Sequence, residues 1–149
     1  MKVTFRKNKF SGVLFFIMSL FWILNSCEVA DDLLGVNATV AKLEGGWSCD
    51  ETSEIYRKST SSVYSVTLSP DPDNDNGLII DNFYGINAPV YATVSGMSLI
   101  VNNQTAEGGY EISGSGIISS NYQKINWTYT VDDGSGVIDH VTAVYTKVK

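Results

Sequence analysis

The stretch Ile125-Asn126-Trp127-Thr128-Tyr129-Thr130-Val131 has the clearest periodicity in the chain. Its odd-numbered residues are large and apolar, whereas its even-numbered residues are small and polar. Successive side chains of a strand point to opposite faces, so one face of this segment is buried and the other is wet. The pattern predicts a strand of an antiparallel sheet with one face toward the core.

Seven further segments have strand character, and from Gly46 onward no convincing helical stripe interrupts them. The segment Tyr110–Gly116 continues the alternation and places Gly114 on the same face as Tyr110 and Ile112. Glycines on an inward face indicate a sharp bend or room for a bulky neighbour. The other candidate strands are Trp47–Ser53, Val63–Leu68, Leu78–Phe83, Val90–Val94, Ser98–Val101 and Ile138–Lys147.

The connections between these strands are short and carry turn residues. Examples are Ser95-Gly96, Asn76-Gly77 and Asp132-Asp133-Gly134-Ser135-Gly136. Short connections place strands that follow one another in sequence side by side in space. Eight such strands predict an all-β, antiparallel up-and-down meander that removes its edges by closing into a β-barrel. A β-sandwich is the alternative architecture.

The first 26 residues differ from this pattern. They contain four basic residues and no acidic one, followed by an apolar run over Val13–Leu24. A basic segment before a short apolar run is typical of a secretory signal peptide. The run is shorter than the roughly 20 apolar residues with which a helix spans a bilayer.

The sequence Leu24-Asn25-Ser26-Cys27 resembles a bacterial lipobox, in which a Leu three residues before a Cys and a small residue just before it direct lipidation and cleavage. The resemblance implies that Cys27 becomes the first residue of the mature protein. Its acyl chains would anchor the protein to the outer membrane of the cell envelope. A plain signal anchor, in which the position of Cys27 has no such role, is the alternative.

The 149 residues suit one folded domain after an N-terminal segment. We divide the chain into a signal peptide (1–26), a tether (27–44) and a β-barrel domain (45–149). Within the tether, Leu33–Leu43 is a candidate short helix, although its β-branched residues disfavour that structure. The acidic residues soon after Cys27 resemble export signals that carry lipoproteins to the surface of Bacteroidetes-type bacteria.

Composition and charge exclude several classes of protein. The whole chain has a net charge of −6, and removal of residues 1–26 with their four positive charges makes it −10. Such an acidic chain repels phosphate backbones, which excludes non-specific binding of nucleic acid. A hydrophobic fraction of 44% with 17% charged residues excludes an intrinsically disordered chain. One His and two Cys are too few for a classical zinc site.

Two ends of the predicted barrel carry a resemblance to a known family. The first strand opens with Gly45-Gly46-Trp47, a G-x-W sequence, and the last ends with Tyr145-Thr146-Lys147. This arrangement resembles the calycin superfamily of lipocalin-like barrels. The central stretches Leu78–Gly85 and Val90–Val94 also resemble the small lipocalin-like lipoproteins of Bacteroidetes-type bacteria. The resemblance covers residues 45–149 and implies that Trp47 packs across the barrel bottom under Lys147. In the family an Arg more often supplies this cation, whose contact with the ring contributes roughly 0.5–2 kcal/mol.

Most of that family has no assigned activity, so candidate sites come from the residues themselves. The inward-facing set is either a packed core or the wall of a cavity, because an eight-stranded barrel can be filled by side chains or hold one small ligand. The candidate ligand-facing residues are Tyr110, Ile112, Gly114, Trp127 and Tyr129.

Other candidates point away from catalysis. Asp71, Asp73 and Asp75 alternate as in a calcium loop, but Asn76 and Asn82 stand where such a loop needs Gly and Glu, which favours an acidic hairpin turn. His140 is the single imidazole, and its neighbour Asp139 would point to the opposite face of a strand. The sequence therefore predicts no catalytic residue, no resident metal and no cofactor.

These observations predict a lipid-anchored envelope barrel that binds a small apolar or amphipathic ligand. A structural or protein-interaction lipoprotein with a filled barrel is the first alternative. The second is an inhibitor of an envelope-targeting enzyme, with acidic loops such as Asp71–Asp75 set against a basic target. The sequence identifies neither the ligand nor a protein partner.

Overall fold

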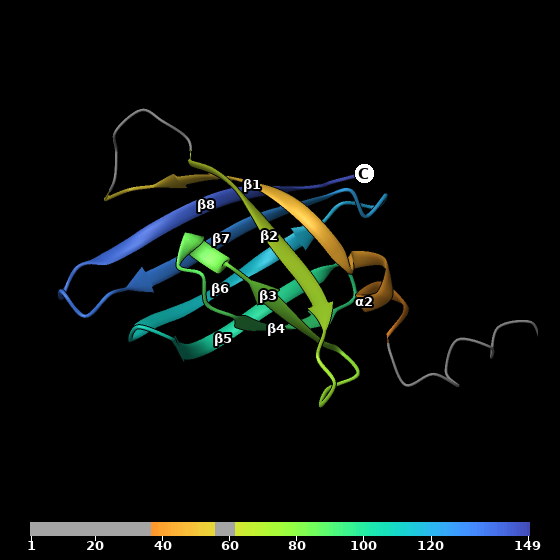
Figure 1. Cartoon of the computed structure of the whole chain (residues 1–149), viewed down its shortest axis with the longest axis horizontal. Coiled ribbons are helices and arrows are strands. Elements are labelled where there is room, and N and C mark those ends of the chain that lie inside the picture. The colour runs from red at the N-terminus through yellow and green to blue at the C-terminus, as the bar shows by residue number, and fades with distance from the viewer. Residues whose placement is uncertain (1–36, 56–61) are drawn as a thin grey trace, which may run out of the picture. The chain divides into compact units, whose positions relative to one another are not determined.

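A computed structural model describes residues 37–55 and 62–149 (Figure 1). The predicted signal peptide, Cys27 and the first part of the tether lie outside the described residues. The described chain forms a closed, all-antiparallel up-and-down barrel of eight strands in sequence order. The predicted barrel is therefore confirmed, and the alternative β-sandwich is not observed. The elements are α2 (Ala38–Leu43), β1 (Gly45–Ser53), β2 (Ser62–Pro70), β3 (Gly77–Asp81), η2 (Phe83–Gly85), β4 (Val90–Ser95), β5 (Ser98–Ala106), β6 (Tyr110–Ile118), β7 (Lys124–Asp132) and β8 (Ile138–Lys147).

The strands follow the predicted ones closely, with two differences. Strand β5 runs five residues beyond the predicted Val101, through a register shift between Val101 and Gln104. The prediction that Phe83 ends the third strand is wrong. Asn82 has a left-handed conformation with φ of 64°, which ends β3. Phe83 is therefore the first residue of the short helix η2.

The glycines of β6 make room for aromatic rings on β7. Gly114 pairs with Tyr129 and Gly116 pairs with Trp127. A Cβ atom at Gly114 would lie 2.3 Å from Cβ of Tyr129, and one at Gly116 would lie 2.9 Å from the Trp127 ring. Of the two reasons for inward glycines, room for a bulky neighbour therefore applies here.

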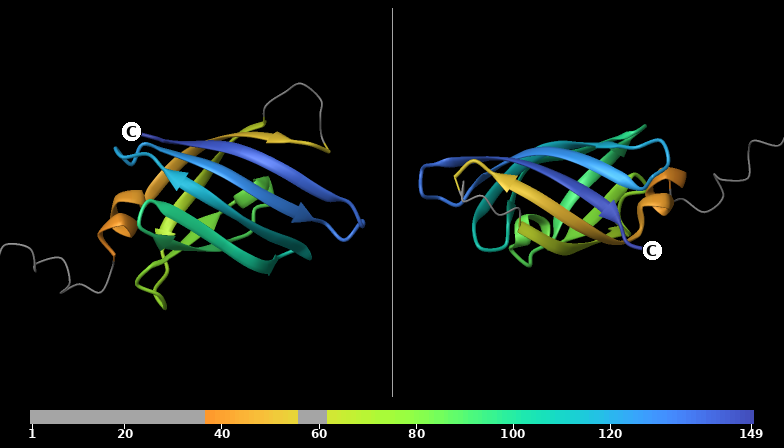
Figure 2. Two further views of the ribbon diagram at one scale, coloured as in Figure 1. Left: turned by 180° about the vertical axis from the view of Figure 1, so that it is seen from behind. Right: turned by 90° about the horizontal axis from the view of Figure 1, so that it is seen from above.

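One end of the barrel is covered by α2, as Figure 2 shows from two further sides. The side chain of Asn37 caps the helix by accepting a hydrogen bond of 2.8 Å from the backbone N–H of Thr39. Val40 and Leu43 are fully buried against the barrel. Residues that the sequence assigned to the tether thus form part of the packed domain. We call this end, where β1, β3, β5 and β7 begin, the α2 end.

The opposite end is covered by the connection between β3 and β4. We call residues Asn82–Asn87 the plug, and this end of the barrel the plug end. Asn82, Tyr84 and Asn87 all have positive φ, between 54° and 64°. Such strain persists only where the surroundings hold it. The side chain of Asn82 supplies this support, because it donates to the Ser65 carbonyl and accepts from the backbone N–H of Asn87.

Candidate functional site

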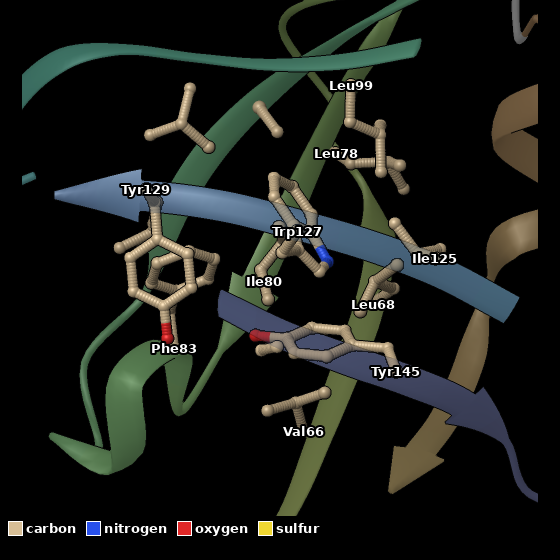
Figure 3. Close-up of a cluster of buried hydrophobic side chains, with 14 of the residues drawn as sticks. Val66, Leu68, Leu78, Ile80, Phe83, Leu99, Ile125, Trp127, Tyr129 and Tyr145 are labelled. Atoms are coloured by element: carbon tan, nitrogen blue, oxygen red, sulfur yellow. The ribbon is translucent and has the colours of Figure 1, made fainter. Parts of the chain in front are cut away.

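The centre of the barrel is filled by an aromatic cluster (Figure 3). Phe83 enters from the plug and is fully buried. Its ring centroid lies 4.6 Å from that of Tyr129, 5.6 Å from that of Trp127 and 6.5 Å from that of Tyr145. These are contact distances for edge-to-face and tilted rings, which pack like the interior of any protein core.

The five candidate ligand-facing residues therefore fall into different environments. Ile112, Trp127 and Tyr129 are buried in the packed core, with at most 2% of each residue exposed. The inner side of Gly114 is occupied by Tyr129. Tyr110 is half-buried, at the rim of the plug end. The structure brings these residues to one side of the interior, but only Tyr110 lines an open surface depression.

At the α2 end, Trp47 and Lys147 meet as the calycin resemblance implies. The Lys147 Nζ lies 5.6 Å from the centroid of the Trp47 ring and donates a hydrogen bond of 2.6 Å to the Lys42 carbonyl. The indole N–H of Trp47 donates to the Leu43 carbonyl at 2.9 Å. Helix α2 thus supplies acceptors for both residues, a role that the sequence did not reveal.

At the plug end, two carboxylates that the sequence analysis did not select lie inside the barrel. The first is Glu51 on β1, which is 8% exposed. Its Oε2 accepts hydrogen bonds from the hydroxyls of Tyr129 and Tyr64. Burial raises the pKa of Glu51, the two hydroxyls oppose this rise, and the nearby charge of Asp139 adds to it.

The second buried carboxylate is Asp139 on β8, which is 2% exposed. Its Oδ2 accepts from the Ser53 hydroxyl at 2.6 Å and from the Tyr84 hydroxyl at 2.8 Å. Its Oδ1 accepts from the backbone N–H groups of Glu54 and Ile55. Burial alone would raise the pKa of Asp139, but these four hydrogen bonds outweigh it and hold the pKa below its usual range.

Charge is distributed unevenly between the two ends. The lysines of the described part all lie at the α2 end, and they are Lys42, Lys124, Lys147 and Lys149. The plug end carries the carboxylates of Glu51, Glu54, Asp81, Glu107, Glu111, Asp132, Asp133 and Asp139. Arg57 and Lys58 stand in the connection from β1 to β2, outside the described residues. The described plug end is therefore acidic.

Within the described part of the chain, the buried Trp127 indole nitrogen has no hydrogen-bond partner, and the Tyr145 hydroxyl has no oxygen or nitrogen partner. In Figure 3 the Tyr145 hydroxyl points toward the side where Phe83 and Tyr129 lie. The buried thiol of Cys49 interacts with the hydroxyls of Tyr64 and Tyr145, yet burial raises its pKa to about 12. Cys49 is therefore a neutral thiol, as expected for a buried small residue and not for a nucleophile.

A shallow open depression lies beside this polar interior. It is bordered by the plug and the turn between β5 and β6, and is lined by Gly85, Ile86, Asn87, Ala88, Glu107, Gly108 and Tyr110. The ring of Tyr110 contacts that of Tyr84 at 6.5 Å, and the Tyr84 hydroxyl binds Asp139. A chain of contacts thus connects the depression to a buried carboxylate.

The other sequence candidates lie elsewhere. Asp71, Asp73 and Asp75 form the turn between β2 and β3 at the α2 end, where the Asp71 carboxylate caps the N–H of Asp73 and the Asp75 carbonyl accepts from Asn37. Within the described residues no group of three His, Cys, Asp or Glu is placed to hold a metal ion. His140 is exposed on the outer face of β8, opposite to Asp139, as the strand alternation predicts.

Comparisons with known proteins add no family to these observations. A scan against protein-family models and a search of curated proteins each returned no match for this chain. The calycin resemblance therefore stays a prediction carried by its G-x-W strand, its terminal lysine and the barrel topology. Over the described residues, no helix is long and apolar enough to cross a membrane.

Proposed function

We propose that the protein is a lipid-anchored barrel of the bacterial cell envelope that binds a small amphipathic molecule at its plug end. The observation that carries this proposal is the open depression beside Tyr110, whose mainly polar lining includes the apolar side chain of Ile86 and which ring contacts connect to a buried carboxylate. Small-molecule sites commonly combine an apolar wall with a few fixed polar groups. The filled centre of the barrel moves the site from the interior, where the sequence placed it, to the rim.

Anchoring and binding would use opposite ends of the domain. The described chain begins at Asn37, at the α2 end, ten residues after the candidate lipidation site Cys27. The plug end is the far end of the same barrel. A tether attached at the α2 end would leave the depression open to solvent, which favours a binding role for the plug end.

The apolar part of the ligand would lie against Ile86, Ala88 and Tyr110 in the depression. Its polar part would face the Tyr84 hydroxyl and the Asp139 carboxylate. The described groups suited to covalent chemistry lie apart, since Cys49 is in the core and His140 is on the outer face. This separation favours binding over catalysis.

The test uses the mature lipoprotein in phosphatidylcholine nanodiscs, with three small probes that share a phenylalkyl body. The probes are 2-phenylethanol, 2-phenylethylamine and 3-phenylpropanoate, followed by equilibrium dialysis against empty nanodiscs. We expect saturable binding of at least one probe. The variant Glu107→Trp fills the depression with an indole and should abolish it.

The matched control is Asp133→Trp, which removes one carboxylate and adds one indole at an exposed position of the same end, away from the depression. It should bind as the unmodified protein does. Binding of no probe, or equal loss in both variants, would contradict the proposal.

A filled barrel with a structural or protein-interaction role is the second candidate. The packing of Phe83 against Trp127, Tyr129 and Tyr145 favours it, because these rings occupy the space of a barrel-centred ligand. In that case none of the three probes would bind. The inhibitor alternative loses support, because the turn Asp71–Asp75 lies at the α2 end, where the chain would enter from its tether.

A further inference from the structure

The lysines of the described residues gather in one place. Lys42 is in α2, Lys124 is the first residue of β7, Lys147 is the last residue of β8, and Lys149 follows soon after it. The Lys147 Nζ donates to the Lys42 carbonyl at 2.6 Å, and the backbone N–H of Lys147 donates to the Gln123 carbonyl at 3.0 Å. These hydrogen bonds join the three segments that carry the lysines. We call Lys42, Lys124, Lys147 and Lys149 the lysine patch.

The lysine patch is positive on a chain that is otherwise acidic, since residues 27–149 have a net charge of −10. Within the described residues, the side-chain contacts of the patch are with neutral groups. The Nζ of Lys42 lies 4.8 Å from the centroid of the Tyr122 ring, and Lys147 contacts the Trp47 ring and a backbone carbonyl. No described carboxylate forms an ion pair with a lysine of the patch. Its positive charge is therefore available to an anionic partner outside the domain.

The carboxylates of the α2 end lie mainly on the other side of the helix. Asp71, Asp73 and Asp75 belong to the turn between β2 and β3, which meets the start of α2 where the Asn37 N–H donates to the Asp75 carbonyl. In Figure 1 and in the left view of Figure 2, the C-terminus and this turn lie on opposite sides of α2. Glu44 follows α2 beside the patch, where four lysines outnumber it. The α2 end thus has a basic half and an acidic half.

Exposed apolar side chains accompany the lysines. Val148, within the C-terminal part of the patch, is 59% exposed, and Met97 in the turn between β4 and β5 at the same end is 36% exposed. The half-buried ring of Tyr122 lies beneath Lys42. Lysines with apolar stems, tyrosines and apolar side chains occur together at membrane–water interfaces. This composition favours a lipid surface over a small soluble anion, which would use the lysines alone.

The predicted lipid anchor limits the distance between this end and a bilayer. Asn37, where the described chain begins, lies ten residues after Cys27. Ten residues span at most about 35 Å when fully extended. An anchor on Cys27 would therefore hold the α2 end close to the lipid surface. Clusters of lysines held near a bilayer are attracted to anionic headgroups.

We propose that the lysine patch docks the α2 end onto the anionic phospholipid headgroups of the membrane that holds the anchor. This inference rests on the lipid anchoring in the proposed function and adds the surface that the α2 end contacts. The same anionic surface attracts the lysine patch and repels the carboxylates of the plug end. Both forces favour one orientation, in which the plug end and its depression point away from the bilayer.

Acetylation of lysines measures this contact. The mature lipoprotein carries Asp133→Lys, which adds a reference lysine at an exposed position of the plug end. It is placed in nanodiscs of phosphatidylcholine, with or without phosphatidylglycerol, and treated with limiting acetic anhydride before mass spectrometry. We expect phosphatidylglycerol to slow acetylation of Lys42, Lys124 and Lys149 relative to the reference by about threefold or more. The difference should vanish in about 1 M salt, where charges interact over only about 3 Å.

Paired variants locate the contact. Lys124→Gln combined with Lys149→Gln removes two charges from the patch and leaves the ring contact of Lys42 in place. Protection of Lys42 by phosphatidylglycerol should then fall below about twofold. The matched control, Asp73→Asn combined with Asp75→Asn, changes two charges in the acidic half of the same end and should retain the full protection. Circular dichroism verifies that each variant is folded.

The outcomes separate this inference from the proposed function. Equal acetylation in the two lipids, with the lipoprotein present in the nanodiscs, would overturn the inference and leave anchoring and ligand binding intact. A larger effect of phosphatidylglycerol at the reference lysine than at Lys42 would also overturn it, because the plug end would then face the bilayer.

Two further outcomes count against the inference. Protection in both lipids that grows with the number of proteins in each nanodisc would replace the lipid surface with a second copy of the chain. A lipoprotein that does not enter nanodiscs would contradict anchoring and docking together. If a paired variant does not fold, the comparison of the two lipids on the Asp133→Lys protein decides alone.

Discussion

The two ends of this barrel are closed by different kinds of residues. The α2 end is closed by apolar residues of a helix, and its polar atoms find partners, as when the Trp47 indole donates to the Leu43 carbonyl. The plug end is closed by a strained loop above buried carboxylates and tyrosines. One end is built for stability. The other carries the groups that a ligand could use.

The strain of the plug indicates what holds it in place. Positive φ at non-glycine residues costs on the order of 1–3 kcal/mol at each position. Asn82, Tyr84 and Asn87 adopt it within six residues. Burial of Phe83 among three aromatic rings offsets this cost. The plug end therefore depends on the core of the barrel, even though its upper surface is polar.

The largest expected effect comes from breaking that dependence. Phe83→Ala removes a fully buried ring and leaves a cavity, so we expect it to lower the free energy of unfolding by about 3–5 kcal/mol. Urea unfolding followed by near-ultraviolet circular dichroism measures this loss. Tyr91→Ala, at a site that is 52% exposed, is the control and should change the free energy by about 0.5 kcal/mol or less. Equal effects of the two changes would show that Phe83 is not part of the core.

A smaller effect is expected from adding one methyl group beneath the plug end. The Cβ of Gly114→Ala would meet Cβ of Tyr129 at 2.3 Å, which forces the strands apart. We expect a loss of about 1–3 kcal/mol, measured as a lower midpoint in urea. Gly46→Ala is the matched control, because no atom lies within 4 Å of its added Cβ. A tolerated Ala at position 114 would mean that the interior is looser than its packing indicates.

The sequence predicted the strands because their alternation is a local property. Every odd-numbered residue from Ile125 to Val131 is buried, as the period of two requires. The closed topology followed from short connections alone. The same logic applied to β1 would have placed Glu51 inward with Trp47 and Cys49, and applied to β8 would have placed Asp139 inward with Val141. The alternation of each strand therefore predicts that these two carboxylates are buried. The sequence analysis missed them because charged residues are normally expected at the surface.

The plug could not be predicted in this way. Its conformation depends on left-handed residues that are not glycine, and nothing local distinguishes Asn82 or Tyr84 from ordinary loop residues. The choice between a cavity and a filled barrel depended on Phe83, which sequence periodicity assigned to a strand. Tertiary packing decides both features. The filled centre is the reason why the proposed site lies at the rim and not inside the barrel.

At the α2 end, the contact between Lys147 and Trp47 predicts a moderate effect. Lys147→Ala removes the cation from the indole and the hydrogen bond to the Lys42 carbonyl, so we expect a loss of about 0.5–2 kcal/mol. Lys147→Arg keeps the charge and should retain most of the stability. Urea unfolding of the three proteins measures the difference. An alanine variant as stable as the unmodified protein would show that Lys147 does not help to close this end of the barrel.

The smallest effect is a change in how stability depends on pH, and it sharpens the contrast inside the plug end. Folding lowers the pKa of Asp139. Its contribution to the free energy of unfolding is therefore present at pH values above its pKa in the unfolded chain, and it is lost as the pH falls through its pKa in the folded protein. Burial raises the pKa of Glu51. Its contribution to the free energy of unfolding is therefore present at pH values below its pKa in the unfolded chain, and it is lost as the pH rises through its pKa in the folded protein.

The variants Asp139→Asn and Glu51→Gln should therefore depart from the unmodified protein in opposite directions along the pH scale. The stability advantage of the unmodified protein over Asp139→Asn should shrink as the pH falls through the acid range. The stability of the unmodified protein relative to Glu51→Gln should instead decrease as the pH rises from the acid range toward neutrality. Urea unfolding at a series of pH values measures both trends. Parallel trends would mean that the two carboxylates share one environment, whereas opposite trends would show that burial dominates at Glu51 and hydrogen bonding dominates at Asp139.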